Sequence, residues 1–412
     1  MPSIGEHDDA ISDGRSVSPE PVNRISSTLP NSFGHIPALD SVRGLAILMV
    51  TVFRFGSTPN NGAFDDSMFQ AAVAVGMRGV DLFFVLSGFL ITGILLDAQG
   101  QPHYFRNFYL RRAVRIFPLY FGVLVALIVV LPAVSESAAE RLSAREHQWW
   151  LWFYGVNLWQ AWTASWPFGC LNHFWSLAVE EHFYLVWPLV IYLCDRRRAI
   201  WACGFIIVLS FAARFTWLLC GGNDVAAEVF TLFRADQLAI GGLLAILIRE
   251  PGFVEVMKRW APSVIGIGVI ALVAIGVSGR RCLGIPDTIY ACVFACLVLA
   301  AVTAPSKTIV CSLANSQVLQ FFGKYSYGLY VFQNPLIPAT ASFISVQSCF
   351  VWTGNPFAAR VLYVAVMTAI ATLIAVASWH LFESHFLKLK RYFPLGLKAH
   401  RSPKPATSLQ SS

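Results

Sequence analysis

The sequence has little charge for its length. Only 13% of its 412 residues are charged and 56% are hydrophobic, a larger apolar share than a soluble core can bury. The composition therefore excludes a soluble globular protein and predicts a polytopic membrane protein. The net charge of +7 comes from Lys and Arg residues placed where the positive-inside rule puts them. It does not indicate a nucleic-acid partner.

Cysteine chemistry has little support. The nine cysteines include no CxxC pair and no Cys/His cluster at metal-ligand spacing, so we expect no metal site. We expect Cys170, Cys220, Cys282 and Cys349 to face outward, and a disulfide between two of them is an open alternative.

The two ends of the chain lack long apolar runs. Residues 1–34 have no apolar core, so no cleaved signal peptide is expected there. Their Ser- and Pro-rich composition predicts a disordered cytoplasmic tail. The sequence predicts a membrane domain over residues 35–391 and a second disordered cytoplasmic tail over 392–412.

Long apolar runs predict an all-α integral membrane protein with about ten transmembrane helices. Basic residues collect in alternate connections, for example at 106–115, 196–198 and 249–259, which predicts that the N-terminus and the C-terminus are both cytoplasmic. The runs lie near residues 38–56, 76–96, 112–132, 174–194, 200–220, 229–248, 262–279, 288–304, 320–346 and 360–382.

The first of these runs carries two arginines, Arg43 and Arg54. Eleven helical residues make about three turns, so both guanidinium groups lie on one face, roughly 16 Å apart along the axis. A charge inside a membrane helix costs roughly 2.5 kcal/mol or more, which favours a face turned towards a cavity in the bundle. The alternative is that the two arginines extend to opposite membrane surfaces.

Carboxylates also interrupt the apolar runs. Asp81 opens the second run, Glu180 and Glu181 lie about a third of the way through the fourth, and Arg234 and Asp236 share the sixth. Each carboxylate inside a membrane needs a cationic partner or water. The pattern therefore predicts a buried polar site in the outer half of the bundle.

Three arginines stand at the cytoplasmic start of the third run: Arg111, Arg112 and Arg115. Guanidinium groups bind phosphate oxygens through paired hydrogen bonds, so the cluster can hold the phosphates of a cytoplasmic donor. It can equally be a topology anchor.

Seven motifs in order resemble one family. They are LDSVRGLAIL, GVDLFFVLSGFLIT, YLRRAVRIFPLY, WSLAVEEHFYLVWPL, RADQLAIGGLLA, GKYSYGLYVFQNPL and HLFESHFLKLKR. Over roughly residues 36–391 they are similar to the acyltransferase-3 family of integral membrane O-acyltransferases. That resemblance implies transfer of an acyl group, commonly acetyl, from cytoplasmic acyl-CoA to a hydroxyl of a carbohydrate such as an exopolysaccharide or lipopolysaccharide. It also implies a bacterial inner membrane, and we expect the form without the esterase-like domain that some members append.

The resemblance also implies roles for residues. It implies a catalytic set of Arg43, Arg54, Asp81 and Glu180, and acyl-CoA binding by Arg111, Arg112 and Arg115. Further substrate-site candidates are Ser87, Trp175, Glu181, Arg234, Asp236, Tyr327 and Gln333.

Two positions depart from the family pattern. Arg54 stands where the family has the histidine that acts as base, and Gln333 stands where related sequences have another histidine. A guanidinium has no acceptor atom and keeps its proton at neutral pH, so Arg54 cannot act as that base. If the base has moved, the candidates are Glu180, Glu181, Asp81, His173 and His182.

Three functions therefore stay open. The first is a working O-acyltransferase with a carbohydrate acceptor, which can be lipid-linked or exported. The second is a pseudoenzyme that binds a glycan or a partner, and the third is a transporter of glycans or lipid-linked sugars. We expect Arg54 to be ion-paired with Glu180 or Asp81, because span counting places all three in the outer half.

Overall fold

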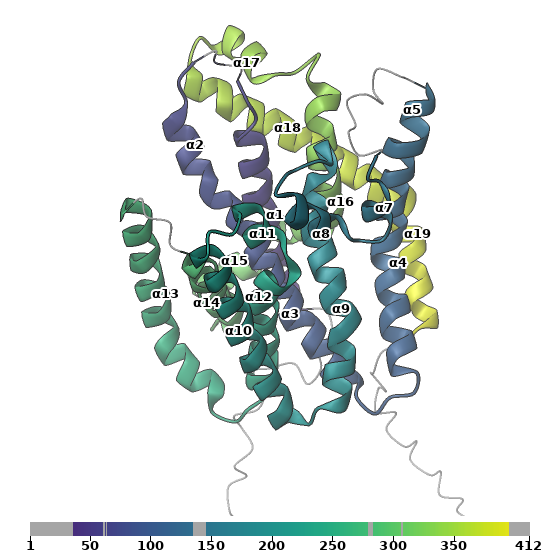
Figure 1. The fold of residues 1–412 in the computed structure, drawn as a ribbon, viewed down its shortest axis with the longest axis vertical. Helices are drawn as coiled ribbons and strands as arrows, with labels where there is room; N and C mark the ends of the chain where they lie inside the picture. The colour runs from purple at the N-terminus through teal and green to yellow at the C-terminus, as the bar shows by residue number, and fades with distance from the viewer. Residues whose placement is uncertain are drawn as a thin grey trace, which may run out of the picture.

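The computed structural model describes residues 36–60, 62, 64–134, 146–278, 283–305 and 308–394, and all regular secondary structure in this part is helical (Figure 1). The fold class is therefore all-α, as predicted. The tail expected at 1–34, most of the tail expected at 392–412, and Cys282 lie outside the described residues. Every described cysteine is free.

The long helices follow the predicted apolar runs. The first half of the chain forms α1 (Pro37–Gly56), α2 (Ser67–Ala74), η2 (Val75–Arg78), α3 (Gly79–Ala98), α4 (Tyr104–Leu124), η3 (Val125–Val130), α5 (Leu131–Val134), α7 (Trp149–Trp152), α8 (Val156–Thr163), η5 (Gly169–Phe174) and α9 (Trp175–Leu193). The second half forms α10 (Arg196–Leu219), α11 (Asp224–Val229), α12 (Thr231–Leu247), α13 (Phe253–Ser278), α14 (Ile285–Thr303), α15 (Ile309–Ala314), α16 (Gln317–Thr340), α17 (Val346–Thr353), α18 (Pro356–Ser378), η6 (Trp379–Glu383), α19 (Ser384–Leu387) and η7 (Lys388–Tyr392).

Local sequence signals mark several helix starts. The Asp195 side chain accepts a hydrogen bond from the Arg198 backbone amide at the start of α10. Ser316 and Asn355 cap α16 and α18 in the same way. These caps satisfy amides that have no partner within the helix.

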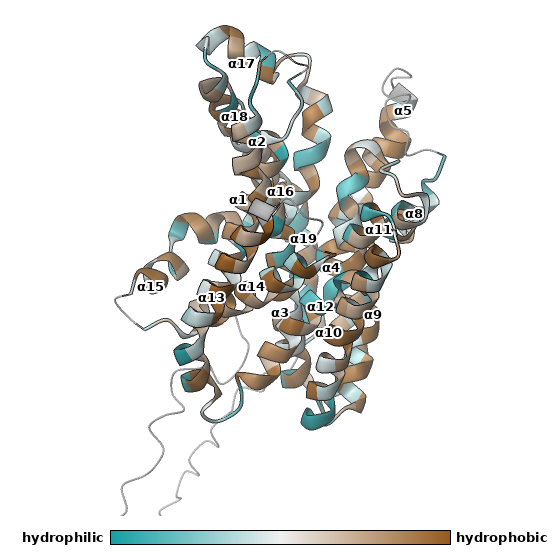
Figure 2. Cartoon of the chain, turned by 60° about the vertical axis from the view of Figure 1, so that its left-hand side comes forward, coloured by the Kyte–Doolittle hydropathy of each residue, from teal (hydrophilic) through white to brown (hydrophobic). Residues whose placement is uncertain are grey.

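Apolar side chains cover the outside of the bundle. Trp201 and Phe205 on α10 and Ile267 and Ile270 on α13 are each more than half exposed, and Figure 2 shows these helices coloured largely as hydrophobic. Within the described residues, seven helical stretches are long and apolar enough to cross a membrane. They are Ser67–Ala98, Tyr104–Val130, Arg196–Leu219, Asp224–Leu247, Phe253–Ile275, Ile285–Thr303 and Pro356–Tyr392. The chain is thus a multi-pass integral membrane protein.

Close contact between α3 and α12 depends on two glycines. A Cβ atom at Gly88 would lie 1.9 Å from the Leu238 carbonyl oxygen, and one at Gly241 would lie 1.9 Å from the Val85 carbonyl oxygen. Small residues let membrane helices approach this closely. The contact brings Asp81 on α3 against Arg234 on α12.

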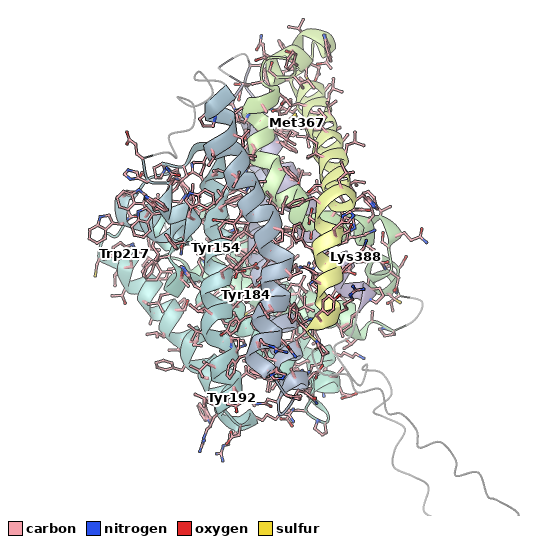
Figure 3. All side chains as sticks on the ribbon, turned by 90° about the vertical axis from the view of Figure 1, so that its right-hand side faces the viewer. Tyr154, Tyr184, Tyr192, Trp217, Met367 and Lys388 are labelled. Carbon is pink, nitrogen blue, oxygen red and sulfur yellow. The ribbon has the colours of Figure 1, made fainter. Side chains whose placement is uncertain are left out.

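Basic helix ends gather at one end of the bundle. Arg249 pairs with Asp97 at 2.7 Å, and Arg196 pairs with Glu250 at 2.6 Å. Arg111 near the start of α4 donates to the Lys390 and Phe393 carbonyl oxygens at 3.1 and 3.0 Å. In Figure 3, Tyr192 lies towards this end and Met367 lies towards the other.

Candidate active site

A cavity of about 100 Å³ lies among α1, α3, α4, α9 and α16, on the side of the bundle where the basic helix ends gather. We call it the inner cavity. Its polar lining consists of Arg43, Ser87, Arg112, Arg115, Ser176, Glu180, Tyr184, Ser326, Tyr327 and Tyr330. The structure thus brings together a catalytic candidate from the first helix, one from the fourth apolar run, and two of the three arginines expected to bind the donor.

Ser87 and Glu180 form the central contact of the inner cavity. The Ser87 hydroxyl donates to Glu180 Oε1 at 2.5 Å, joining α3 to α9. A carboxylate that holds a serine hydroxyl can accept a proton from it or from a hydroxyl that takes its place. Glu180 is therefore the carboxylate of the inner cavity that is placed to act as a base.

The predicted arginine cluster divides. Arg112 and Arg115 line the inner cavity, and the Arg112 guanidinium lies 4.2 Å from the centroid of the Tyr184 ring. Arg111 instead binds the Lys390 and Phe393 carbonyl oxygens and does not line the inner cavity. Arg43 from α1 is the third arginine that lines the inner cavity.

A larger cavity of about 530 Å³ lies on the other side of Tyr330, and we call it the outer cavity. Its lining includes Arg54, Arg78, Asp81, His173, Trp175, Glu228, Arg234, Asp287, Tyr330 and Asn334. Val80 and Tyr330 line both cavities. The two cavities therefore meet at these side chains.

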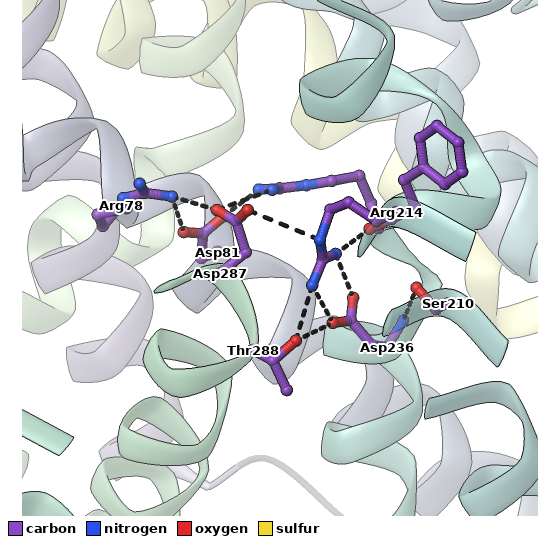
Figure 4. A network of polar contacts seen from close by, with 9 residues as sticks. Arg78, Asp81, Ser210, Arg214, Asp236, Asp287 and Thr288 are labelled. Carbon is purple, nitrogen blue, oxygen red and sulfur yellow. Dashed lines mark hydrogen bonds and ion pairs between the residues drawn. The ribbon is translucent and has the colours of Figure 1, made fainter. Parts of the chain in front are cut away.

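Ion pairs form one wall of the outer cavity (Figure 4). Asp81 pairs with Arg234 and, at 3.3 Å, with Arg78. Asp287 pairs with Arg78 at 2.5 Å and with Arg234 at 3.3 Å. Alternating charges at these distances compensate one another where water is scarce. Asp81 thus forms ion pairs with two arginines and is part of this wall of the outer cavity.

Asp236 belongs to the same network but lines neither cavity. It pairs with Arg214 at 2.9 Å, and both side chains are fully buried. The Thr288 hydroxyl donates to Asp236 at 2.7 Å, and Arg214 also approaches Asp287 at 3.8 Å. Asp236 therefore supports the wall from behind.

Arg54 differs from the other arginines of the outer cavity. Within the described residues its guanidinium forms no ion pair, and its buried Nε has no hydrogen-bond partner. The expected ion pair with Glu180 or Asp81 is wrong, because Asp81 is taken by Arg78 and Arg234 and Glu180 lies in the inner cavity. Glu228 lines the same cavity and its charge acts on Arg54, but the two side chains form no ion pair within 4 Å.

Tyr330 is held at the junction of the cavities. Its hydroxyl donates to the His173 carbonyl oxygen at 2.8 Å and contacts the Ser176 hydroxyl. The His173 ring is 1% exposed, and neither of its nitrogens has a hydrogen-bond partner among the described residues. His173 therefore lines the outer cavity with both ring nitrogens buried, so it does not present an accessible base to a group in the cavity.

The remaining candidates have separate positions. Tyr327 lines the inner cavity and donates to the Ile116 carbonyl oxygen at 2.7 Å, and Trp175 lines the outer cavity. Glu181, His182 and Gln333 line neither cavity. His182 Nδ1 lies 2.7 Å from the Thr231 hydroxyl, and Gln333 is fully buried beside Thr51.

Several residues of the site were not among the sequence candidates. Arg78, Asp287 and Glu228 were missed in the outer cavity, and Ser176 and Tyr330 were missed at the junction. Asp287 could have been found, because it opens the apolar run of α14 as Asp81 opens that of α3. Ser176 and Tyr330 carried no such signal, because an uncharged hydroxyl residue does not interrupt an apolar run as a carboxylate does.

The sequence is similar to known O-acetyltransferases. The chain is 27% identical over 379 residues to YrhL of Bacillus subtilis (strain 168), which is predicted to be a peptidoglycan O-acetyltransferase; the match covers 85% of this chain and 54% of YrhL. It is 25% identical over 339 residues to the peptidoglycan O-acetyltransferase OatA of Listeria monocytogenes, with 77% of this chain and 52% of OatA covered. The chain thus spans about half the length of these curated relatives. No solved structure matches it.

The family is shown by a direct match. The family model described as an acyltransferase domain matches residues 36–377, a range that contains α1 to α17, all but the last residue of α18, and the residues that line both cavities. The chain therefore belongs to the acyltransferase-3 family of membrane acyltransferases, as its motifs predicted.

Proposed function

We propose that this protein transfers an acyl group, most simply acetyl, from acyl-CoA to a carbohydrate hydroxyl. The observation that carries the proposal is the meeting of two unlike cavities at Tyr330. One cavity has the cations that an anionic donor needs, and the other has the volume and mixed polarity that suit a sugar.

The inner cavity suits the donor. Arg43, Arg112 and Arg115 provide three guanidinium groups around a narrow space, and guanidinium forks bind phosphate oxygens well. In this proposal they hold the phosphates of CoA at the mouth of the cavity. The thioester then lies near Ser87 and Glu180.

The transfer step joins the two cavities. The acceptor hydroxyl enters from the outer cavity past Tyr330, and its oxygen attacks the thioester carbonyl carbon. Glu180 takes the hydroxyl proton, the new O–C bond forms, the C–S bond breaks, and the proton passes to the departing thiolate. Arg54 has no part in proton transfer, because it has no acceptor atom.

The proposed topology follows the same logic. α1, α9 and α16 join the seven apolar stretches to give ten spans. The inner cavity and the basic helix ends face the cytoplasm, where acyl-CoA is found, and both chain ends lie on that side. Because the relatives named above are bacterial, we place the protein in a bacterial cytoplasmic membrane.

The proposal is tested with the purified protein in proteoliposomes, acetyl-CoA and a panel of free and lipid-linked glycans. We expect acceptor-dependent release of free CoA, and a loss of about 10²-fold or more in Glu180→Gln, the usual contribution of a positioned base. Glu181→Gln is the matched control, because Glu181 is the adjacent residue and lines neither cavity.

A pseudoenzyme is the second candidate, and Arg54 is the observation that favours it. If the base was lost with the family histidine, the protein binds glycans but releases no CoA with any acceptor. In that case the Arg54→His variant should release CoA in the presence of an acceptor, whereas the wild type does not. CoA release by the wild type, reduced in Glu180→Gln alone, decides against the pseudoenzyme.

A further inference from the structure

A third cavity of about 620 Å³ joins the outer cavity from the side. Arg54, Gly169 and Asn334 line both. The rest of its lining is mostly apolar and includes Leu127 and Leu131 from η3 and α5, and Pro335, Ile337, Pro338 and Ala339 from α16. We call it the side groove.

One side of the side groove is formed by η3 and α5, and η3 also carries exposed apolar side chains. Val129 and Val130, on η3 beside it, are 53% and 52% exposed, and such exposed apolar residues face hydrocarbon in a membrane protein. Pro335 and Pro338 lie inside α16 along the other side of the groove. The groove is thus mostly apolar and lies beside lipid-facing surface, as a hydrocarbon chain requires.

Arg54 lies where the apolar groove meets the polar outer cavity. It is in the last turn of α1, and within the described residues it has no ion pair. Arg78 and Arg234 in the same cavity each pair with Asp81 and Asp287. Glu228 acts on Arg54 only from beyond ion-pair distance. A cation without a direct ion pair in this setting is costly, and an anion bound beside it recovers part of that cost.

These observations identify one kind of ligand. It has a hydrocarbon chain for the groove, an anionic group for Arg54, and a polar part that reaches past Arg54 into the outer cavity. We infer that the acceptor is a glycan joined through phosphate to a single long prenyl or alkyl chain. The inference rests on the proposed function, since it names the substrate class for that same site.

The order of groups in such a lipid matches the order of the cavities. The chain lies between η3 and α16, the phosphate lies at Arg54, and the first sugars lie among His173, Trp175 and the ion-pair wall. The sugar hydroxyls then reach the junction at Tyr330. An arginine in place of the family histidine thus exchanges a base for a phosphate-binding group.

Binding tests this inference without any acyl-CoA. The probes are N-acetylglucosamine linked through phosphate to a farnesyl chain, farnesyl phosphate, inorganic phosphate and phosphatidylglycerol. Each is titrated against the full chain in nanodiscs of neutral lipid. We expect the sugar-bearing farnesyl probe to bind at least tenfold more tightly than the other three.

Two pairs of variants test the two parts of the proposed site, which are Arg54 and the side groove. Arg54→Gln should weaken binding of that probe about tenfold or more, and Arg54→Lys should restore most of it because the charge is kept. Ala339→Trp should block the groove. Ala341→Trp is its matched control, because Ala341 is exposed at the end of α16 and does not line the groove.

The inference is overturned if Arg54→Gln or Ala339→Trp leaves binding unchanged, or if phosphatidylglycerol or inorganic phosphate binds as tightly as the sugar-bearing probe. The failure of the proposed function is a separate result. Tight, Arg54-dependent binding without CoA release under any condition would keep the lipid site and reject the acyl transfer. CoA release with free glycans only would keep the transfer and reject the lipid site.

Discussion

Adjacent residues on α4 and α9 have different surroundings because a helix turns by about 100° at each residue. Glu180 faces the inner cavity and Glu181 does not. Arg112 lies in the same cavity, whereas Arg111 is turned to the backbone of η7. At this scale the site depends on which side of a helix a charge occupies, and neighbouring residues provide matched controls.

Arg112→Gln should weaken binding of CoA by about tenfold, because it removes one guanidinium fork from the inner cavity. Arg111→Gln should leave CoA affinity nearly unchanged, since Arg111 already binds two carbonyl oxygens. Calorimetric titration of CoA into the purified protein measures both. Equal losses in the two variants would mean that the arginines anchor α4 and do not select the donor.

Removal of Arg234 should destabilise the protein more than removal of Arg54. Arg234→Gln leaves Asp81 and Asp287 with fewer cations in a buried wall, and breaking such a pair typically costs about 3 kcal/mol or more. Arg54→Gln breaks no ion pair seen among the described residues, so about 1 kcal/mol or less is expected. Denaturant unfolding in detergent compares them, and a larger loss in Arg54→Gln would contradict the charge arrangement.

At the scale of elements, glycine contacts set where the helices meet. Gly88 on α3 and Gly241 on α12 each face a backbone carbonyl oxygen of the other helix. The same contact places Asp81 beside Arg234. The ion-pair wall therefore depends on helix separation as well as on charge.

Gly88→Ala should separate α3 from α12 and cost about 1–3 kcal/mol, the usual range for overpacking. Gly204→Ala on α10 is the control, because an added Cβ meets no atom within 4 Å there, and alanine favours a helix by up to about 1 kcal/mol. Thermal unfolding in detergent should fall for the first variant and hold or rise for the second. Similar midpoints would show that α3 and α12 are not held this closely.

The helices were predictable from the sequence, but the partners of their charges were only partly so. Hydrophobic runs are local, and those predicted for α3 and α14 agree with the structure within a few residues. Partner choice is not local: Arg234 meets Asp81 across 153 positions and Asp287 from α14. Counting spans placed Arg54 and Asp81 at similar depth in the membrane. Similar depth does not determine which arginine forms an ion pair with which carboxylate.

At the scale of the whole molecule, the bundle contains two distinct cavities that meet at shared side chains. The inner cavity is lined by Arg43 from the first half of α1 and by Arg112 and Arg115 from α4, whereas the outer cavity and the side groove share Arg54 in the last turn of α1. Tyr330 and Val80 are the side chains shared by the two cavities. We expect donor and acceptor to arrive from opposite faces of the membrane.

The orientation can be measured by cysteine labelling in intact cells, starting from a variant without native cysteines. A cysteine at Arg197 should be protected from an impermeant thiol reagent, because the basic end is expected in the cytoplasm. A cysteine in place of Asp224, the first residue of α11, should be labelled. Asp224 follows the end of α10 that is opposite to Arg197. The reverse pattern would invert the proposed topology.

The central claim is transfer between the two cavities, and sealed vesicles with the cytoplasmic face outward test it most directly. The best acceptor from the glycan panel is enclosed in the vesicles, and labelled acetyl-CoA is added outside. The account predicts labelled acceptor inside and one free CoA outside for each acetyl group transferred, with Glu180→Gln inactive. Acetylation only when donor and acceptor share one side, or none in any arrangement, would contradict it.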